Sequence, residues 1–203
     1  MGLDKDGAWS AIATGRAAYS APALLAVLAL LAAAGGEGAR LLLRYERGRI
    51  AAGEVWRLAT GHIVHLGNSH LVLNLAGLAL VAYLVGPALD LRRWLLAILT
   101  SAAAISGAFW VFEPRLDWYV GLSGVLHGLL AAGVVAGWDT RHAESWLLAA
   151  VLVAKLAWEQ LAGPLPGSEA AAGGPVVTVA HLYGTLGGGL AGLAAVRRRG
   201  ASI

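Results

Sequence analysis

Cysteine is absent from the sequence, and charged residues make up only 13% of its 203 positions. Without cysteine, the chain forms no disulfide and no thiolate metal site. Hydrophobic residues make up 58% of the chain, a balance that excludes an ordinary soluble domain and is typical of an integral membrane protein. The net charge of +3 comes from arginines beside apolar runs and not from a continuous basic face, so we expect no nucleic-acid partner.

Long apolar runs dominate what is present. They predict an all-α, polytopic membrane protein whose six transmembrane helices form one bundle, because such runs cross about 30 Å of hydrocarbon. No internal repeat and no long linker divides the chain, so residues 1–203 are predicted to form a single membrane domain. The six runs are Pro22–Ala34, His70–Gly86, Trp94–Phe112, 120–138, Trp146–Leu161 and Val176–Val196.

The segments around these runs predict the topology. Residues 1–20 form a short tail, residues 44–69 a long interfacial first loop, and residues 197–203 a basic C-terminal tail. The lysines and arginines of the short loops place both termini in the cytoplasm, although the arginine-rich first loop favours the opposite orientation. Cleavage of the first run as a secretory signal peptide is an open alternative. Apolar residues resume at Leu41, which favours a first span instead.

Ser123 lies between two glycines at the start of the fourth run, in the sequence Gly-Leu-Ser-Gly-Val-Leu-His-Gly at 121–128. A hydroxyl in a membrane helix needs a structural or a chemical reason. The neighbouring small residues allow another helix to come close, so helix packing is one interpretation. A nucleophile is the other, and residues elsewhere in the chain decide between the two.

His181 lies as deep in the sixth run as Ser123 lies in the fourth. If the helices alternate in direction, the second, fourth and sixth are parallel, and both residues lie about five residues, or about 7 Å, inside the outer interface. His181 shares a helix face with Gly184, Gly188 and Gly192, which allows close approach to the fourth helix. An imidazole that accepts the serine proton makes the hydroxyl a nucleophile. No acidic residue lies at this depth in the three parallel helices, so we expect a Ser-His dyad without a carboxylate partner.

His70 and Asn74 begin the second run and lie four residues apart on one helix face. Both side chains, together with the Ser123 backbone N–H, are candidate donors to the oxyanion that forms when a serine attacks an amide. The alternative is that they only cap the start of their helix. Zinc binding by His62, His65 and His70 is an alternative, but the serine site accounts better for His70. We therefore expect no metal and no cofactor.

Lys155, Glu159 and His127 also lie within apolar runs. Lys155 and Glu159, four apart in the fifth run, are predicted to form an ion pair that faces the bundle, because unpaired charges are costly in a membrane. The alternative is that Glu159 receives a substrate segment or an amine acceptor. His127, one turn after Ser123, either shapes the substrate pocket or only packs.

Together these motifs resemble the rhomboid intramembrane serine proteases over about residues 40–196. The resemblance implies a six-helix bundle with Ser123 as nucleophile, His181 as base, and His70 and Asn74 on the oxyanion side. It also implies transmembrane substrates that bend at the outer membrane surface and are hydrolysed by water from that side. The matching motifs are Trp56-Arg57, His70-x-x-x-Asn74, Gly121-x-Ser123-Gly124 and Ala180-His181-x-x-Gly184.

A narrower resemblance is to the rhombosortase branch. It implies a bacterial inner-membrane enzyme, with its site open to the periplasm, that removes a C-terminal anchor from secreted proteins. Such anchors consist of a Gly-Gly motif, an apolar helix and a basic tail. Transfer of the new end to a lipid-derived group stays open beside hydrolysis. His127 stands where many other rhomboids have a tyrosine. The matching motifs are Gly61-His62-x-x-His65, the run 121–128 and Lys155-Leu-Ala-Trp-Glu159-Gln160.

Other functions stay open beside this one. A general rhomboid protease would cleave other single-span substrates. A non-catalytic rhomboid-like protein would hold membrane clients, but such proteins typically lack the serine or the histidine. A small transporter would place its polar residues nearer the membrane midplane. Apart from a transmembrane protein substrate and membrane lipids, the sequence indicates no partner, and it leaves the oligomeric state open.

Overall fold

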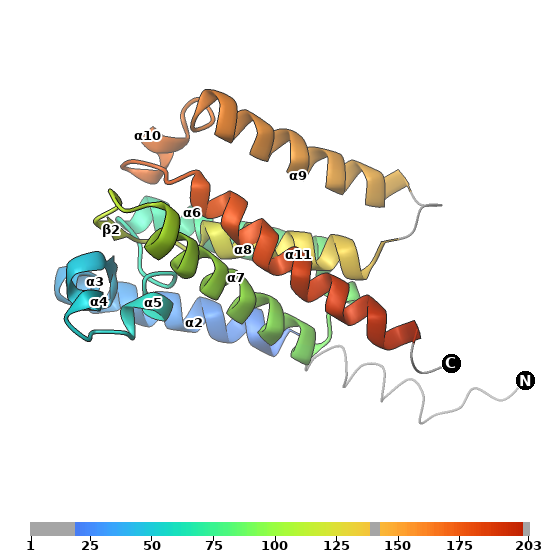
Figure 1. The fold of residues 1–203 in the computed structure, drawn as a ribbon, viewed down its shortest axis with the longest axis horizontal. Coiled ribbons are helices and arrows are strands. Elements are labelled where there is room, and N and C mark those ends of the chain that lie inside the picture. The colour runs from blue at the N-terminus through green and yellow to red at the C-terminus, as the bar shows by residue number, and fades with distance from the viewer. Residues whose placement is uncertain (1–18, 139–142, 201–203) are drawn as a thin grey trace, which may run out of the picture.

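The structure, a computed structural model, describes residues 19–138 and 143–200, with side chains in the last helix as far as Ala194. The predicted tails at 1–20 and 197–203 lie largely outside this range, although Ser20 begins α2 and α11 continues to Gly200. The described part is mostly helical, as predicted (Figure 1).

Five long helices and the short α8 form the body of the molecule, and the short elements gather at one end of it (Figure 1). Helices α6, α8 and α11 begin at that end, as the alternation of helix directions predicted. The body consists of α2 (Ser20–Ala34), α6 (Asn68–Val85), α7 (Leu91–Phe112), α8 (Ser123–Ala136), α9 (Ala143–Ala162) and α11 (Val179–Gly200). The short elements at this end are α3 (Gly36–Leu43), α4 (Arg47–Ala51), α5 (Arg57–Thr60), α10 (Ser168–Ala172), β1 (Tyr45–Glu46) and β2 (Trp118–Tyr119).

By length and hydropathy, three described helices are able to cross a membrane: α6 with the 3₁₀ turn η1 (Gly86–Ala88) that follows it, α7 and α9. The pair α2 and α3, bent by 117° at Gly35, makes a fourth if it is one span. The count of six spans is therefore not confirmed. Helix α8 has 14 residues, or about 21 Å at 1.5 Å per residue, and is shorter than a full crossing. The chain is nevertheless a membrane protein with spanning helices.

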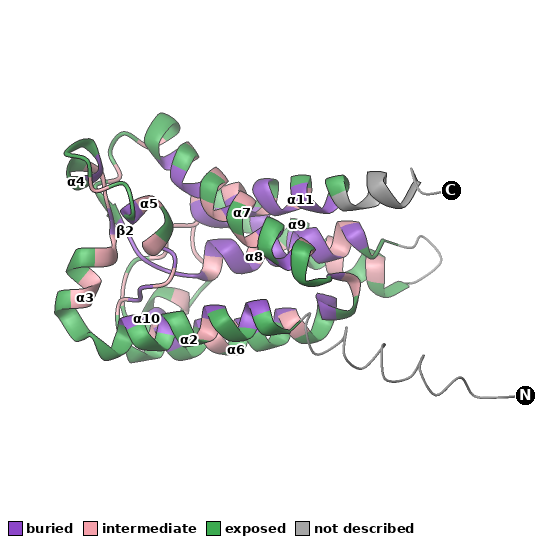
Figure 2. Cartoon of the chain, turned by 90° about the horizontal axis from the view of Figure 1, so that it is seen from below, coloured by how far each residue is buried: buried purple, intermediate pink, exposed green. Residues whose placement is uncertain are grey.

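Helix α8 occupies the centre of the molecule (Figure 2). Nine of its 14 residues are buried, so it packs against protein on most sides. Its closest neighbour is α11, and glycines make this contact possible. A Cβ on Gly184 would overlap the carbonyl of Gly124, and a Cβ on Gly188 would overlap the carbonyl of Gly128. The prediction that the glycine stripe brings these helices together is confirmed.

The first loop folds into a compact layer around Arg57. This side chain is buried, pairs with Glu54 at 2.7 Å, and donates to the carbonyls of Leu41 and Arg44 at 2.8 and 2.9 Å. The guanidinium therefore joins the end of α3 to the segment before α5 and braces the loop. The antiparallel pairing of β1 with β2 then ties the loop to the segment before α8. This small ladder was not predicted.

Helix α9 is the most loosely attached of the long helices. It lies along one side of the bundle, apart from the other helices over most of its length (Figure 1). Three of its 20 residues are buried, namely Leu152, Leu156 and Glu159. The two leucines pack against Ala131 of α8, so a narrow stripe on one face holds α9 in place.

Candidate active site

Ser123 is the first residue of α8, directly after a tight turn. Gly121 has φ +133°, a backbone conformation that side chains with a Cβ rarely adopt, and its N–H donates to the Gly61 carbonyl at 3.1 Å. The Tyr119 hydroxyl donates to the Gly121 carbonyl at 2.7 Å, and burial raises the pKa of Tyr119, so the phenol stays protonated. Helix α8 begins at Ser123, within the apolar run at 120–138, because this turn precedes it.

The structure brings Ser123 and His181 together. The serine Oγ lies 2.9 Å from the histidine Nε2, within hydrogen-bonding distance. His181 is the third residue of α11 and is buried. The close approach of the two helices through their glycines places these side chains in contact, as the sequence predicted; their catalytic roles stay a prediction.

A carboxylate also reaches His181, and this corrects the expectation of a dyad without one. Glu159 Oε2 lies 2.8 Å from His181 Nδ1, and Glu159 Oε1 lies 2.6 Å from the Lys155 ammonium. The three parallel helices hold no acidic residue at this depth, and the carboxylate comes from an antiparallel one. Helix α9 runs the other way, so its fourth residue from the end lies level with the first turn of α11. The predicted ion pair of Lys155 with Glu159 is confirmed.

These contacts assign the protons of His181. A carboxylate only accepts hydrogen bonds, so the proton is on Nδ1, where it is donated to Glu159. The lone pair of Nε2 is then available to the Ser123 hydroxyl. This is the tautomer that a general base needs if it is to take a proton from the serine.

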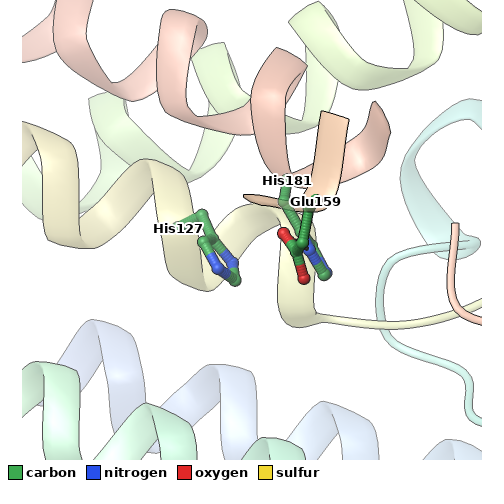
Figure 3. A group of neighbouring side chains, drawn as sticks. All are labelled: His127, Glu159 and His181. Atoms are coloured by element: carbon green, nitrogen blue, oxygen red, sulfur yellow. Dashed lines mark hydrogen bonds and ion pairs between the residues drawn. The ribbon is translucent and has the colours of Figure 1, made fainter. Parts of the chain in front are cut away.

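His127 lies beside His181 from the next turn of α8. The two rings stack with centroids 4.1 Å apart and planes inclined by 14°. His127 Nδ1 donates to the Ser123 carbonyl at 2.7 Å, which holds the ring in this orientation. His127, Glu159 and His181 come from three helices and converge on one space (Figure 3). Of the two interpretations left open for His127, the contact with the site favours the first.

His70 and Asn74 line the same cavity as Ser123 and also make local bonds. The Leu66 N–H donates to His70 Nδ1 at 3.3 Å, so the proton of His70 is on Nε2, beside Gly121. Asn74 Nδ2 donates to the His70 carbonyl at 2.9 Å. Both alternatives for this pair, bracing of the helix and donation into the site, are therefore compatible with the geometry.

The cavity at Ser123 has a volume of about 220 Å³, enough for several water molecules. Helix α10 and the segment before α11 close one side of it, while α6, α8, α9 and α11 form the others. Its polar lining is His70, Asn74, Tyr119, Ser123, His127, Lys155, Glu159, Ser168 and His181.

The first-loop histidines are the metal ligands that the sequence offers, and the structure groups a different set. Among the described residues, the possible ligands that converge are His127, Glu159 and His181, with ligand atoms within 4.8 Å of one another. His127 Nδ1, both ring nitrogens of His181 and both carboxylate oxygens of Glu159 already have hydrogen-bond partners. His62 instead contacts the Ser106 hydroxyl at 3.0 Å, and His65 lies edge-on to His70.

Comparison with known proteins decides the family. The family model described as the rhomboid domain matches residues 52–198. The chain belongs to the rhomboid family. Its rhomboid domain is 37% identical over 87 residues to "Rhomboid protease GluP" of Bacillus subtilis (strain 168), covering 43% of this chain. It is 32% identical over 148 residues to "Rhomboid-like protease 5" of Toxoplasma gondii, covering 71% of this chain. Each match spans 17% of the relative's length.

Proposed function

We propose that this chain is an intramembrane serine endopeptidase. The observation that carries the proposal is the contact of Ser123 with His181 beside a cavity at the end of a buried helix. The family supports it, since both relatives are named as proteases. The serine also has a base in place at His181, as a hydroxyl nucleophile requires.

The reaction proceeds in two acyl-transfer steps. Ser123 Oγ attacks the substrate carbonyl carbon while its proton passes to His181 Nε2; collapse of the intermediate breaks the C–N bond, and the amine leaves with that proton. Water then attacks the ester carbonyl, gives its proton to His181, and releases the new carboxylate and the Ser123 hydroxyl. If an amine attacks in place of water, the product is an amide.

The developing oxyanion needs donors that are already in place. The first N–H groups of a helix have no partner within it, so the Ser123 backbone N–H at the start of α8 is one donor. The Nε2–H of His70 and the free amide hydrogen of Asn74 are the side-chain donors that line the same cavity. Each donor aimed at the oxyanion stabilises the transition state more than the bound substrate, and so lowers the activation barrier.

The finer proposal is the rhombosortase activity. The substrate is a secreted bacterial protein with a Gly-Gly motif, an apolar anchor and a basic tail, and the enzyme removes that anchor in the inner membrane. Six spans, cytoplasmic termini and a site open to the periplasm belong to this proposal. Its support is the motif resemblance in the first loop, at 121–128 and at 155–160.

Co-expression with a single-span substrate of that design tests both levels of the proposal. We expect cleavage by the wild type and none by Ser123→Ala or His181→Ala, and mass spectrometry of the product's new C-terminus distinguishes hydrolysis from transfer. A second substrate, with the two glycines replaced by leucine, tests specificity. Equal cleavage of both substrates contradicts the rhombosortase assignment alone. Equal binding without cleavage by all three enzymes supports a client-binding protein instead.

A further inference from the structure

Glu159 stands out among the polar groups of the site because both of its carboxylate oxygens have partners. Its side chain is 3% exposed, with Oε2 at His181 and Oε1 at Lys155. The ion pair with Lys155 already compensates the charge, as a charge within a membrane helix requires. The contact with His181 is therefore additional to what burial demands.

We propose that Glu159 is a positioning residue that completes a Ser123–His181–Glu159 triad, and that docking of α9 against α8 assembles it. This inference rests on the proposed protease function. By accepting the Nδ1–H of His181, the carboxylate holds the ring in the tautomer that accepts the Ser123 proton at Nε2. It also stabilises the imidazolium that exists after that proton has moved, without itself becoming protonated.

The packing of α9 makes the triad dependent on this helix. Leu152, Leu156 and Glu159 lie on one helix face at spacings of four and three residues, and they are the three buried residues of α9. The leucines contact α8, and the carboxylate one turn further contacts His181 of α11. Ser123 and His181 lie on the tightly packed helices α8 and α11. Glu159 is therefore the residue of the triad that lies on a loosely attached helix, α9.

Lys155 fixes the other end of the carboxylate. Its ammonium lies 2.6 Å from Oε1, and its side chain is 29% exposed at the cavity. Holding Oε1 leaves Oε2 aimed at the histidine. A charge-assisted contact of this length restricts the glutamate rotamer more than a neutral one does.

Steady-state cleavage of the model substrate, with Glu159→Gln, tests the triad. We expect kcat to fall about 100-fold and KM to stay within about twofold, because the carboxylate acts on the transition state and not on substrate binding. Glu159→Asp keeps the charge and should recover part of kcat. The matched control is Glu113→Gln, which removes a carboxylate bound at 2.8 Å to Tyr183 of the same helix α11; its kcat should stay within about twofold.

The outcomes separate this inference from the protease proposal. If the wild type neither cleaves the substrate nor reacts with a fluorophosphonate, the proposed protease function itself is contradicted. If the wild type is active and folded Glu159→Gln is equally active, only the triad is overturned and the protease function stands. Folding is followed by thermal unfolding in detergent. If the unpaired Lys155 unfolds Glu159→Gln, the double variant Lys155→Met/Glu159→Gln removes both charges and is judged by the same kcat criterion.

A double-mutant cycle tests the part played by α9. Leu156→Ala weakens the contact of α9 with α8 and should lower kcat in the same direction as Glu159→Gln. If docking acts through the carboxylate, Leu156→Ala should cause no further loss in the Glu159→Gln background, a non-additive result. Fully additive losses contradict assembly by docking.

Discussion

His181 is the residue on which the polar groups of the site converge. Ser123 contacts its Nε2, Glu159 its Nδ1, and His127 its ring face. Each contact removes a degree of freedom: the carboxylate selects the tautomer, the stacked ring restricts the tilt, and the serine uses the remaining lone pair. A base held in this way needs little reorganisation when it takes the proton.

Asn74 provides the residue-scale prediction for the oxyanion. Asn74→Ala should lower kcat about 100-fold, as expected when one oxyanion donor is lost, and should leave fluorophosphonate binding detectable. The measurement is kcat on the model substrate together with thermal unfolding. Asn74→Asp is the paired variant, because the carboxylate is similar in shape but donates no hydrogen bond. If Asn74→Ala changes the unfolding temperature and not kcat, the side chain only braces α6.

His62 provides the residue-scale prediction for pH. Burial in the first loop lowers its pKa from 6.5 to about 4, and burial also lowers the pKa of His65 to about 4. Between pH 4 and 6.5 the unfolded chain therefore binds more protons than the folded one. The stabilisation from the neutral histidines is fully present above about pH 6.5 and is lost as the pH falls toward 4. A shift of this size is worth about 3 kcal/mol per histidine at 1.36 kcal/mol per pH unit.

Thermal unfolding in detergent, followed by tryptophan fluorescence between pH 8 and 4.5, measures this loss. His62→Gln should be less stable at pH 8, since the contact with Ser106 changes, and should lose less stability on acidification than the wild type. An equal loss in both proteins contradicts the assignment of the pH dependence to His62.

At the scale of helices, parallel direction and glycine spacing were sufficient to predict the Ser123–His181 contact. The same reasoning did not predict the Glu159–His181 contact, because equal depth from the same end applies only to parallel helices and α9 is antiparallel to them. The missed signal was present in the sequence: two charges four apart in a membrane run, near its outer end. The turn at Gly121 and the β1–β2 ladder were missed as well, since two-residue strands have no detectable periodicity.

Gly188 and Gly189 form a matched pair for the packing of α8 on α11. A Cβ at Gly188 would overlap the Gly128 backbone, whereas a Cβ at Gly189 meets nothing within 4 Å. Gly188→Ala should destabilise the protein by about 1–3 kcal/mol or more, the usual cost of overpacking, and should lower the labelling rate by moving His181. Gly189→Ala should leave the unfolding temperature unchanged or raised, since alanine favours helix. Equal effects would contradict the close approach of these helices.

At the scale of the whole molecule, the mostly helical membrane fold followed from composition and apolar runs, whereas the count of six spans is not confirmed. Helix α8 shows why. Surrounded by protein, a central helix need not match the hydrocarbon thickness, so an apolar run at 120–138 becomes a helix of 14 residues. The relation between helix length and bilayer thickness applies to helices that face lipid. It overestimates the length of a helix that is surrounded by protein.

The orientation in the membrane gives the prediction at this scale. Because the chain has no cysteine, single substitutions report on accessibility without background. Gly48→Cys, at the end with the site, should react with a membrane-impermeant maleimide in spheroplasts. Ala143→Cys, at the start of α9, should react only after permeabilisation. The reversed pattern contradicts the proposed orientation of the site toward the periplasm.

The most direct measurement of the central claim is mass spectrometry of the protein after reaction with a fluorophosphonate. We expect one adduct on Ser123 in the wild type and none in Ser123→Ala, with much slower modification in His181→Ala because the base is missing. Other serines of the bundle, such as Ser101 and Ser106, should stay unmodified. An unmodified Ser123 in folded, membrane-embedded protein, or equal labelling of Ser123→Ala, contradicts the account of this chain as a serine protease.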